Sequence, residues 1–346
     1  MITIYSTIEE FDSLEPAWNE LYARTPGATP FQSFAFCRAA LPLLSGSLHI
    51  IAWRRKNELL AIFPLYIDSS RTLRFINDRH ADFCGPLVAE VAAGDFHLCE
   101  ALAEHIRGCK TIRRVRLENL RRDLFQTSLQ FQLKGSLLYG YSRYSYFTVP
   151  AAGTAKSFID SLAQLSTKEK YRLKNIFSKI EKSGAAWRSF DASRGDAWPA
   201  GMILSLTDSM VSSGIRKRKY LSPEYLAFIQ AVYDSGAMVI SATYLGGKPV
   251  SCNLYLKNGD EFIDWMAFYT EPSYNAWNLL QFLEWFHSNG GGTLNFARGI
   301  YMYKVHNFRP ALGDLGRFRY SKCFFGRVGD AAGCLISEIK RMRRSR

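Results

Sequence analysis

The sequence has 346 residues and a formal net charge of +13, and 47% of its residues are hydrophobic and 14% aromatic. This length is about two domains' worth, and the composition allows a sizeable apolar core. No apolar run is long enough to cross a bilayer, and the first residues lack the pattern of a signal peptide, so we expect neither feature. The seven cysteines include no C-x-x-C pair and the six histidines show no metal-ligand spacing, which predicts reduced thiols in a cytoplasmic protein and no metal site.

Residues 1–150 are predicted to alternate helices with strands. Apolar residues spaced by three and four, including Phe11 and Trp18, predict an amphipathic helix over 8–22. Strands are expected at 48–53, 59–67, 73–76, 112–120 and 139–149, and a further helix at 96–107. The break Pro150-Ala151-Ala152-Gly153-Thr154 predicts a domain boundary at residue 150.

A second domain is predicted over 151–327, followed by a basic amphipathic tail over 328–346. Ser166 and Glu169 form a capping-box pattern that begins a helix over 167–183, in which Lys and Arg greatly outnumber acidic residues. Helices are also expected at 198–213 and 224–233. The tail is either a solvated end or an attachment to anionic lipid or RNA.

The stretch 236–309 has the strongest pattern in the chain. Strand-like runs occupy 238–245, 250–256 and 262–269, and Asn258-Gly259 is a strong hairpin signal. An apolar helix is expected over 278–288, ending at Asn289-Gly290-Gly291-Gly292, and a short strand over 293–297. A meander of strands, then a helix and a strand, is therefore predicted here.

Motifs along the chain resemble, in order, those of a known family. They are Trp18-Asn19-Glu20-Leu21, Pro30-Phe31-Gln32, Asp82-Phe83-Cys84-Gly85-Pro86-Leu87, Phe296, Arg298-Gly299 and Tyr303-Lys304. The family is the GNAT acyltransferase superfamily, and within it the type linked to cellulose and exopolysaccharide biosynthesis (CelD/BcsL-like). The sequence departs from that pattern where Asn295 and Ile300 replace acids and where Asn275-Ala276-Trp277 replaces Ser-Pro-Gly.

The resemblance implies an α/β fold with mixed sheets, arranged as tandem GNAT-like domains with a cleft between them. This two-domain layout is also that of the FemABX transferases. It further implies a cytoplasmic biosynthetic enzyme, with peripheral attachment at the inner membrane face as an option. The oligomeric state is not readable from the sequence.

Transfer of the GNAT type needs a held thioester, a neutral amine and donors for the developing negative charge. Asp264, in an apolar aromatic strand, is the candidate base, with a salt bridge to Arg298 as the structural alternative. Tyr303 is the candidate acid, with core packing as its alternative. Lys304 and Arg298 are candidates for holding an anionic group. Asn295 and Tyr269 complete the candidate set, as a substrate hydrogen-bonding group and a second phenol; core packing is the alternative for Tyr269.

The phosphate-binding elements are less regular than in the family. A pyrophosphate loop is expected at 273–278, but it carries no glycine, and bulky side chains replace the small residues that close approach to phosphate favours. Arg172 and Lys174, on the basic helix, are predicted to contact an anionic part of donor or acceptor. The alternative for both residues is a solvated helix face.

Three functions remain open at this point. The first is N-acyl transfer from acyl-CoA or a related thioester to an amine of a sugar, amino acid or peptide. The second is FemABX-like aminoacyl transfer from aminoacyl-tRNA, which the net charge of +13 favours. The third is a non-catalytic GNAT-fold binding protein, which the replacement of two acids favours. Expected partners are thus a carrier-linked anionic donor, an amine acceptor, and tRNA or an anionic membrane surface.

Overall fold

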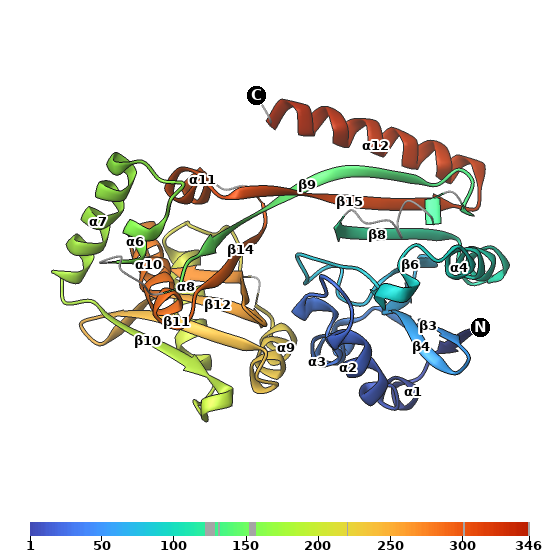
Figure 1. The fold of residues 1–346 in the computed structure, drawn as a ribbon, viewed down its shortest axis with the longest axis horizontal. Helices are drawn as coiled ribbons and strands as arrows, with labels where there is room; N and C mark the ends of the chain where they lie inside the picture. Colours follow the sequence, from blue (N-terminus) through green and yellow to red (C-terminus); the bar gives the residue numbers. More distant parts are fainter. Residues whose placement is uncertain (122–128, 131, 152–156, 220, 300–301, 345–346) are drawn as a thin grey trace. The chain divides into compact units, whose positions relative to one another are not determined.

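The computed structural model describes residues 1–346 except 122–128, 131, 152–156, 220, 300–301 and 345–346, and it describes no side chains at 302–303 and 337–344. The chain divides into two compact units (Figure 1). Unit 1 contains Met1–Arg143 and Asp314–Arg346, and unit 2 contains Tyr144–Gly313. The contact-defined units differ from the sequence-based division, because residues after 313 return to unit 1. The boundaries at 150 and 327 stay a prediction about independently folding domains.

Unit 1 holds two sheets and five described α-helices. The first sheet has the order β1-β3-β4-β7 and is antiparallel, and the second runs β15-β8-β6-β5-β2, with β6 and β8 parallel. The strands are β1 (Ile2–Tyr5), β2 (Gly46–Leu48), β3 (Ile50–Arg55), β4 (Glu58–Phe63), β5 (Leu65–Asp68), β6 (Thr72–Phe75), β7 (Leu87–Val88), β8 (Arg114–Arg121) and β15 (Ala311–Ser321). The helices are α1 (Ile8–Asp12), α2 (Glu15–Ala23), α3 (Phe34–Ala40), α4 (Phe96–Gly108) and α12 (Phe324–Arg344).

An aromatic cluster holds the first helices of unit 1 together. Phe11 of α1 stacks on Phe34 of α3, with ring centroids 4.9 Å apart, and Trp18 of α2 packs edge-on against Phe34. The single helix predicted over 8–22 is in fact two, because Pro16 falls in the first turn of α2, where its missing N–H is tolerated. The helix break follows from that residue.

Unit 2 is a mixed sheet with helices on both faces. The strand order is β10-β11-β12-β13-β14-β9, antiparallel except for β13 and β14. The strands are β9 (Leu137–Val149), which begins in unit 1, β10 (Ala186–Asp191), β11 (Met238–Leu245), β12 (Lys248–Asn258), β13 (Glu261–Tyr269) and β14 (Gly292–Arg298). The helices are α6 (Phe158–Ser161), α7 (Thr167–Glu181), α8 (Ala200–Ser212), α9 (Pro223–Asp234), α10 (Pro272–Ser288) and α11 (Met302–Phe308).

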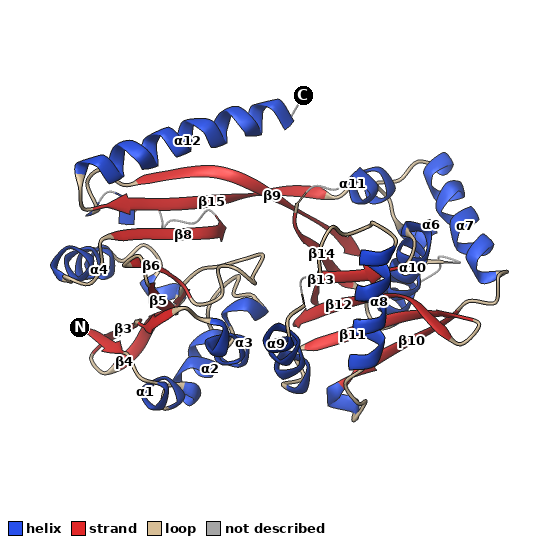
Figure 2. Ribbon diagram, turned by 180° about the vertical axis from the view of Figure 1, so that it is seen from behind, coloured by secondary structure: helices blue, strands red, loops and turns tan. Residues whose placement is uncertain are grey.

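Helix α10 lies on one face of the unit 2 sheet and α8 on the other (Figures 1 and 2). Alternation along the strands explains this, since successive side chains point to opposite faces. The core on the α10 face is strongly aromatic: Tyr255 of β12 stacks on Phe282 of α10, with centroids 3.6 Å apart. Burial of such rings is the main term that fixes the helix on the sheet.

The predicted order of strands and helix over 236–309 is confirmed, as is the capping box of Ser166 and Glu169 at the start of α7. One boundary was wrong. Helix α10 begins at Pro272, so residues 273–278 form its first turns and not the loop expected there. Pro is favoured at a first helical position, which explains why the helix begins at Pro272. No helix in the described part of the chain is long and apolar enough to span a membrane.

Candidate active site

Strands β13 and β14 share only a short stretch of parallel pairing. Glu261–Ile263 pair with Thr293–Asn295, and Asp264 is the next residue on β13. Each strand is irregular just beyond this stretch. On β13 the register with β12 shifts so that Trp265 is an extra residue, and β14 shifts its register with β9 between Asn295 and Arg298. Such bulges redirect strands and side chains next to functional sites. The end of the β13–β14 pairing is therefore the place to look for a site.

A buried ion pair lies at this point. The side chain of Asp264 is 3% exposed and that of Lys304, on α11, is 6% exposed, and Lys304 Nζ lies 3.5 Å from Asp264 Oδ2. Lys304 Nζ also donates to the Phe296 carbonyl at 2.8 Å and lies 5.1 Å from the centre of the Phe296 ring. Where the pairing of β14 is irregular, the Phe296 carbonyl thus accepts a hydrogen bond from Lys304. Two candidates from the sequence, Asp264 and Lys304, are brought together.

A chain of buried amides and hydroxyls continues from the ion pair. Asn253 of β12 donates to Asp264 Oδ1 at 3.2 Å, and Asn278 of α10 donates to Asn253 Oδ1 at 2.8 Å. Asn278 also donates to Ser241 Oγ at 2.9 Å and accepts from Thr243 Oγ1 at 3.2 Å. We name Ser241, Thr243, Asn253, Asp264, Asn278 and Lys304 the buried polar cluster.

The four neutral members of this cluster carry little signal in the sequence. Ser241, Thr243 and Asn253 alternate with apolar residues on β11 and β12, and Asn278 lies four residues before the aromatic Phe282 on α10. A polar residue repeated on the helix-facing side of neighbouring strands is the one signal that could have identified them. Each of the four is at most 1% exposed, so their hydrogen bonds are what makes their burial tolerable.

Asn295 holds the bulge of β14 rather than facing an open space. Its Nδ2 donates to Glu261 Oε1 at 2.9 Å, and its Oδ1 accepts from the backbone N–H of Ala297 at 2.9 Å. Ala297 has φ of +58°, a left-handed conformation that is uncommon for a residue with a side chain. The predicted role of Asn295 in binding substrate stays untested, and its contacts favour a role in backbone geometry.

The other candidates near β14 are less fully defined. Tyr303 precedes Lys304 on α11, but its side chain lies outside the described residues. Arg298 is half-buried at the end of β14, opposite Tyr144 of β9. Tyr269 is half-buried at the end of β13, opposite Ser251. Lys304 is an ion-pair partner of Asp264, and the salt bridge between Asp264 and Arg298 stays a prediction.

Two members of the basic helix α7 bond to the protein itself. Arg172 Nη2 donates to the carbonyl of His306 and to Oδ1 of Asn307, both at 3.0 Å and both on α11. Lys174 Nζ lies 2.6 Å from Asp160 Oδ1, and this hydrogen bond lowers the pKa of that carboxyl. Arg172 therefore ties α7 to the helix that carries Lys304. The predicted contact of Arg172 and Lys174 with an anionic substrate is not tested by these bonds.

The start of α10 is poorly suited to a phosphate group. Glu271 is the N-cap residue; its side chain does not cap the helix backbone but accepts from Ser273 Oγ at 3.5 Å, and Pro272 removes one of the N–H groups of the first turn. A carboxylate at a helix N-terminus occupies the region that would otherwise favour an anion. The missing glycine in the sequence and the start of α10 in the structure therefore both oppose phosphate binding at this position.

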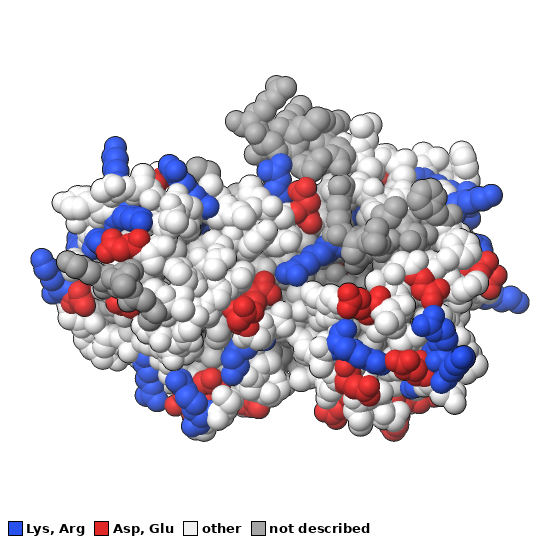
Figure 3. All heavy atoms as spheres, viewed as in Figure 1, with Lys and Arg blue, Asp and Glu red and all other residues white. Residues whose placement is uncertain are grey.

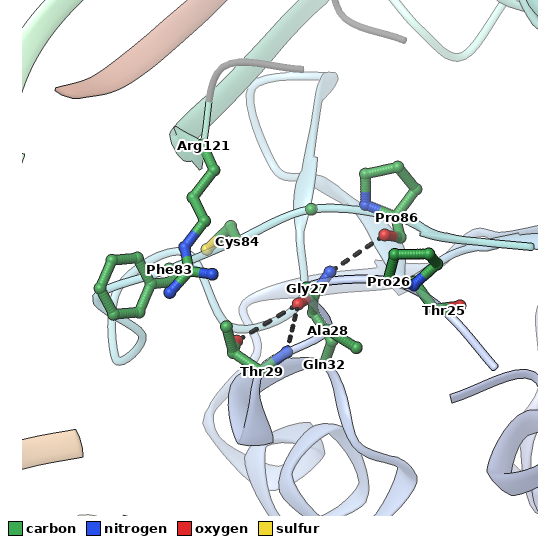
Figure 4. Close-up of a pocket in the computed structure, with 11 residues that line it drawn as sticks. Thr25, Pro26, Gly27, Ala28, Thr29, Gln32, Phe83, Cys84, Pro86 and Arg121 are labelled. Carbon is green, nitrogen blue, oxygen red and sulfur yellow. Dashed lines mark hydrogen bonds between the residues drawn. The ribbon is translucent and has the colours of Figure 1, made fainter. Parts of the chain in front are cut away.

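A small pocket in unit 1 brings together two of the sequence motifs (Figure 4). Gln32 Nε2 donates to the Pro86 carbonyl at 3.0 Å, and Gln32 Oε1 accepts from the Thr29 N–H at 2.9 Å. Arg121 lies over the Phe83 ring, 4.6 Å from its centre. The Pro30-Phe31-Gln32 and Asp82-to-Leu87 motifs are therefore tied to each other by the Gln32 amide.

A histidine pair lies elsewhere in unit 1. His49 Nε2 and His105 Nε2 are 2.8 Å apart, and these atoms and Cys109 Sγ all lie within 4.8 Å of one another. Burial lowers the pKa of His49 to about 4 and also lowers that of His105, so a neutral imidazole donates to a neutral imidazole. No sequence pattern indicates this pair, because its members come from segments far apart in the chain.

The excess positive charge is not gathered into one broad basic area on the face shown in Figure 3, where basic and acidic side chains of the described residues are interspersed. Part of the excess belongs to the end of the chain. Residues 340–346 contain five basic side chains and no acidic one.

The architecture is of the predicted α/β class with mixed sheets, and solved structures share its fold. One is the C-terminal domain assigned to a lysylphosphatidylglycerol synthetase from Agrobacterium fabrum, with a TM-score of 0.61 and 10% identity over 95% of this chain and 96% of that one. L-PGS from Bacillus licheniformis gives a TM-score of 0.58 at 11% identity, covering 94% of this chain and 95% of its own. FemX gives 0.60 at 10% identity, covering 93% and 97%.

These likenesses confirm the predicted tandem GNAT-like architecture, which the resemblance had linked to the FemABX transferases. No protein-family model matches the sequence, and the search of curated proteins gives no match. At about 10% identity the shared fold does not by itself define a reaction. The CelD/BcsL-like type stays a resemblance of motifs.

Proposed function

We propose that this protein is an acyl-group transferase that joins an acyl or aminoacyl group to an amine by direct attack of the amine on an activated carbonyl. The observation that carries the proposal is the buried pair of Asp264 and Lys304 at the end of the β13–β14 pairing. Its fold, shared with FemX and with a lysylphosphatidylglycerol synthetase domain, supports the same class of reaction.

The proposed roles follow from the needs of the reaction. As the new N–C bond forms, the amine gives up a proton and the carbonyl oxygen gains negative charge. Asp264 accepts that proton, and the ammonium of Lys304 stabilises the oxyanion electrostatically. The tetrahedral intermediate then collapses, the bond to the donor's sulfur or oxygen breaks, and Tyr303 returns a proton to the leaving group. The assignment of Tyr303 rests on the motif alone.

The donor is either an acyl thioester of coenzyme A or an aminoacyl ester on tRNA. Glu271 and Pro272 at the start of α10 oppose a pyrophosphate there, and the chain's net charge of +13 suits a polyanion. Both observations favour the aminoacyl-tRNA version. The acceptor is an amine of a sugar, amino acid or peptide. Arg172, Lys174, Arg298, Asn295 and Tyr269 stay candidates for contacts with donor or acceptor.

Binding measurements with purified protein distinguish the donors. A panel of acyl-CoAs is titrated by calorimetry, and aminoacyl-tRNA binding is measured from 50 to 200 mM salt. We expect tRNA affinity to fall steeply, by about 10³-fold to 10⁵-fold for six to ten phosphate contacts. If an acyl-CoA binds instead, Glu271→Gln is expected to strengthen acyl-CoA binding, because it removes a negative charge at the start of α10. An affinity for tRNA that does not change with salt counts against the tRNA version.

Turnover tests the chemistry and the non-catalytic alternative together. The assay measures transfer of a labelled acyl or aminoacyl group to an amine acceptor. The proposal is supported if the transfer rate falls by about a hundredfold or more in Lys304→Met and also in the double variant Asp264→Asn, Lys304→Met. Full activity in the double variant removes the site assignment. Absence of transfer with every donor that binds favours a GNAT-fold binding protein.

A further inference from the structure

Helix α12 exposes an unusual number of large apolar side chains. Five are more than half exposed: Phe324 (71%), Phe325 (85%), Val328 (52%), Leu335 (64%) and Ile336 (53%). Exposed apolar residues are common when scattered singly, whereas a contiguous group on one element marks an interaction surface. We name these five residues the apolar face of α12.

The spacing puts all five residues on one side of the helix. At about 100° per residue, positions 324, 325, 328, 335 and 336 fall within an arc of roughly 120°. By the same spacing Ile339 and Met342 belong to this arc in the sequence. The apolar side of the helix thus extends through most of its length.

The opposite side of α12 packs against the rest of unit 1. Asp330, directly opposite the middle of that arc, is 5% exposed and accepts from Ser321 Oγ at 2.7 Å. It also forms an ion pair with Arg319 of β15 at 3.5 Å. Gly326 packs so closely that a Cβ there would lie 2.8 Å from the side chain of Ser321. These contacts fix which side of α12 faces the protein and leave the apolar face outward.

The charge near this face is positive at the C-terminal end. Residues 340–346 carry five Lys or Arg and no acid, and they follow the apolar arc without a break in the helix up to Arg344. An apolar stripe joined to a basic segment suits a helix that lies in the plane of an anionic membrane surface. A second copy of the chain would bring its own basic segment, so its charge does not complement this one.

We propose that α12 attaches the protein to a lipid bilayer that contains anionic lipid. The apolar face enters the boundary between headgroups and acyl chains, and the basic segment meets the headgroups. In this proposal α12 lies in the plane of the membrane surface and does not cross the bilayer; no helix among the described residues is long and apolar enough to do so. This inference does not depend on the proposed transferase activity.

The test uses the full chain and lipid vesicles in a sedimentation assay. Binding is measured to phosphatidylcholine vesicles with and without 30% phosphatidylglycerol. We expect at least tenfold stronger binding to the anionic vesicles, and further weakening of about fivefold for each basic residue removed from 340–346. Equal binding to both vesicles, or binding to neither, overturns the proposal.

The variants are chosen at exposed positions so that the fold is retained. The triple variant Phe325→Ser, Leu335→Ser, Ile336→Ser is expected to lose at least tenfold in vesicle binding, while circular dichroism and melting stay unchanged. Val91→Ser, at a position that is 69% exposed in the turn Glu90–Ala92, which packs against β4, is the control and is expected to bind as the wild type does. A triple variant that binds normally refutes the inference. So does light scattering that shows a dimer which the triple variant dissociates, since a second copy would then cover the face.

Discussion

The ion pair between Asp264 and Lys304 is buried, so we expect that breaking it destabilises the protein more than breaking an exposed ion pair does. The two side chains are 3% and 6% exposed, so removing either partner leaves a charge in surroundings that solvate it poorly. We expect Asp264→Asn or Lys304→Met alone to lower the free energy of unfolding by about 3–5 kcal/mol. The double variant removes both charges, and we expect it to return to within about 1–2 kcal/mol of the wild type.

Lys174 and Asp160 provide the matched control. Their N–O distance of 2.6 Å is shorter than the 3.5 Å between Lys304 and Asp264, yet their side chains are 45% and 34% exposed. Water screens this pair, so Lys174→Met is expected to cost less than about 1 kcal/mol. If the N–O distance alone decided the cost, Lys174→Met would destabilise the protein more than Lys304→Met, whereas burial predicts the opposite.

Urea unfolding followed by tryptophan fluorescence measures all of these variants, since Trp265 lies next to Asp264 on β13. The reasoning fails if the single variants at 264 and 304 cost no more than Lys174→Met. It also fails if the double variant costs the sum of the two singles, because the charges would then not interact.

Three further outcomes test other parts of the structure. Asn278→Ala is expected to lower the free energy of unfolding by about 1–3 kcal/mol, because it strips partners from buried groups, while the exposed Asn289→Ala changes it by about 0.5 kcal/mol or less in the same urea titration. Arg172→Ala is expected to lower both the melting temperature and turnover, because it frees α11; a raised KM with unchanged melting would instead indicate direct substrate contact. The pKa of His49 is lowered from 6.5 to about 4, so between these pH values only the unfolded chain takes up a proton at this residue, and the free energy of unfolding falls by up to about 1.4 kcal/mol for each unit by which the pH is lowered. His49→Asn should flatten this dependence in unfolding measured from pH 7 to 5. An unchanged slope would contradict the burial argument.

The strands of unit 2 could be predicted because local patterns decide them. The runs over 238–245 and 262–269 are β-branched or aromatic and are bounded by turn residues, which is sufficient to define a strand. The first turn of α10 could not be predicted in this way, because Asn275 is a poor helix former. The amide of Asn278, where the predicted helix begins, is compensated by hydrogen bonds with residues of β11 and β12. Local propensity contains no record of those partners.

The same distinction holds for the site. Asp264 and Lys304 could each be singled out, one as a carboxylate in an apolar strand and the other by its motif, but their pairing depends on where α11 packs after β14. The amide of Asn295 was assigned to substrate from the motif, whereas its contacts with Glu261 and Ala297 arise from a bulge that spacing does not reveal. Contacts that depend on register are the part that the sequence left open.

The division of the chain has a consequence for how the protein is made. Unit 2 is continuous from Tyr144 to Gly313, whereas unit 1 needs both its first 143 residues and those from Asp314 onward. During synthesis, unit 2 is complete before most of β15 and all of α12 exist, and β8 must wait for β15, a strand with which it pairs. The N-terminal half thus finishes folding last. A fragment ending at residue 143 lacks that strand, while 144–313 is the natural piece to express alone.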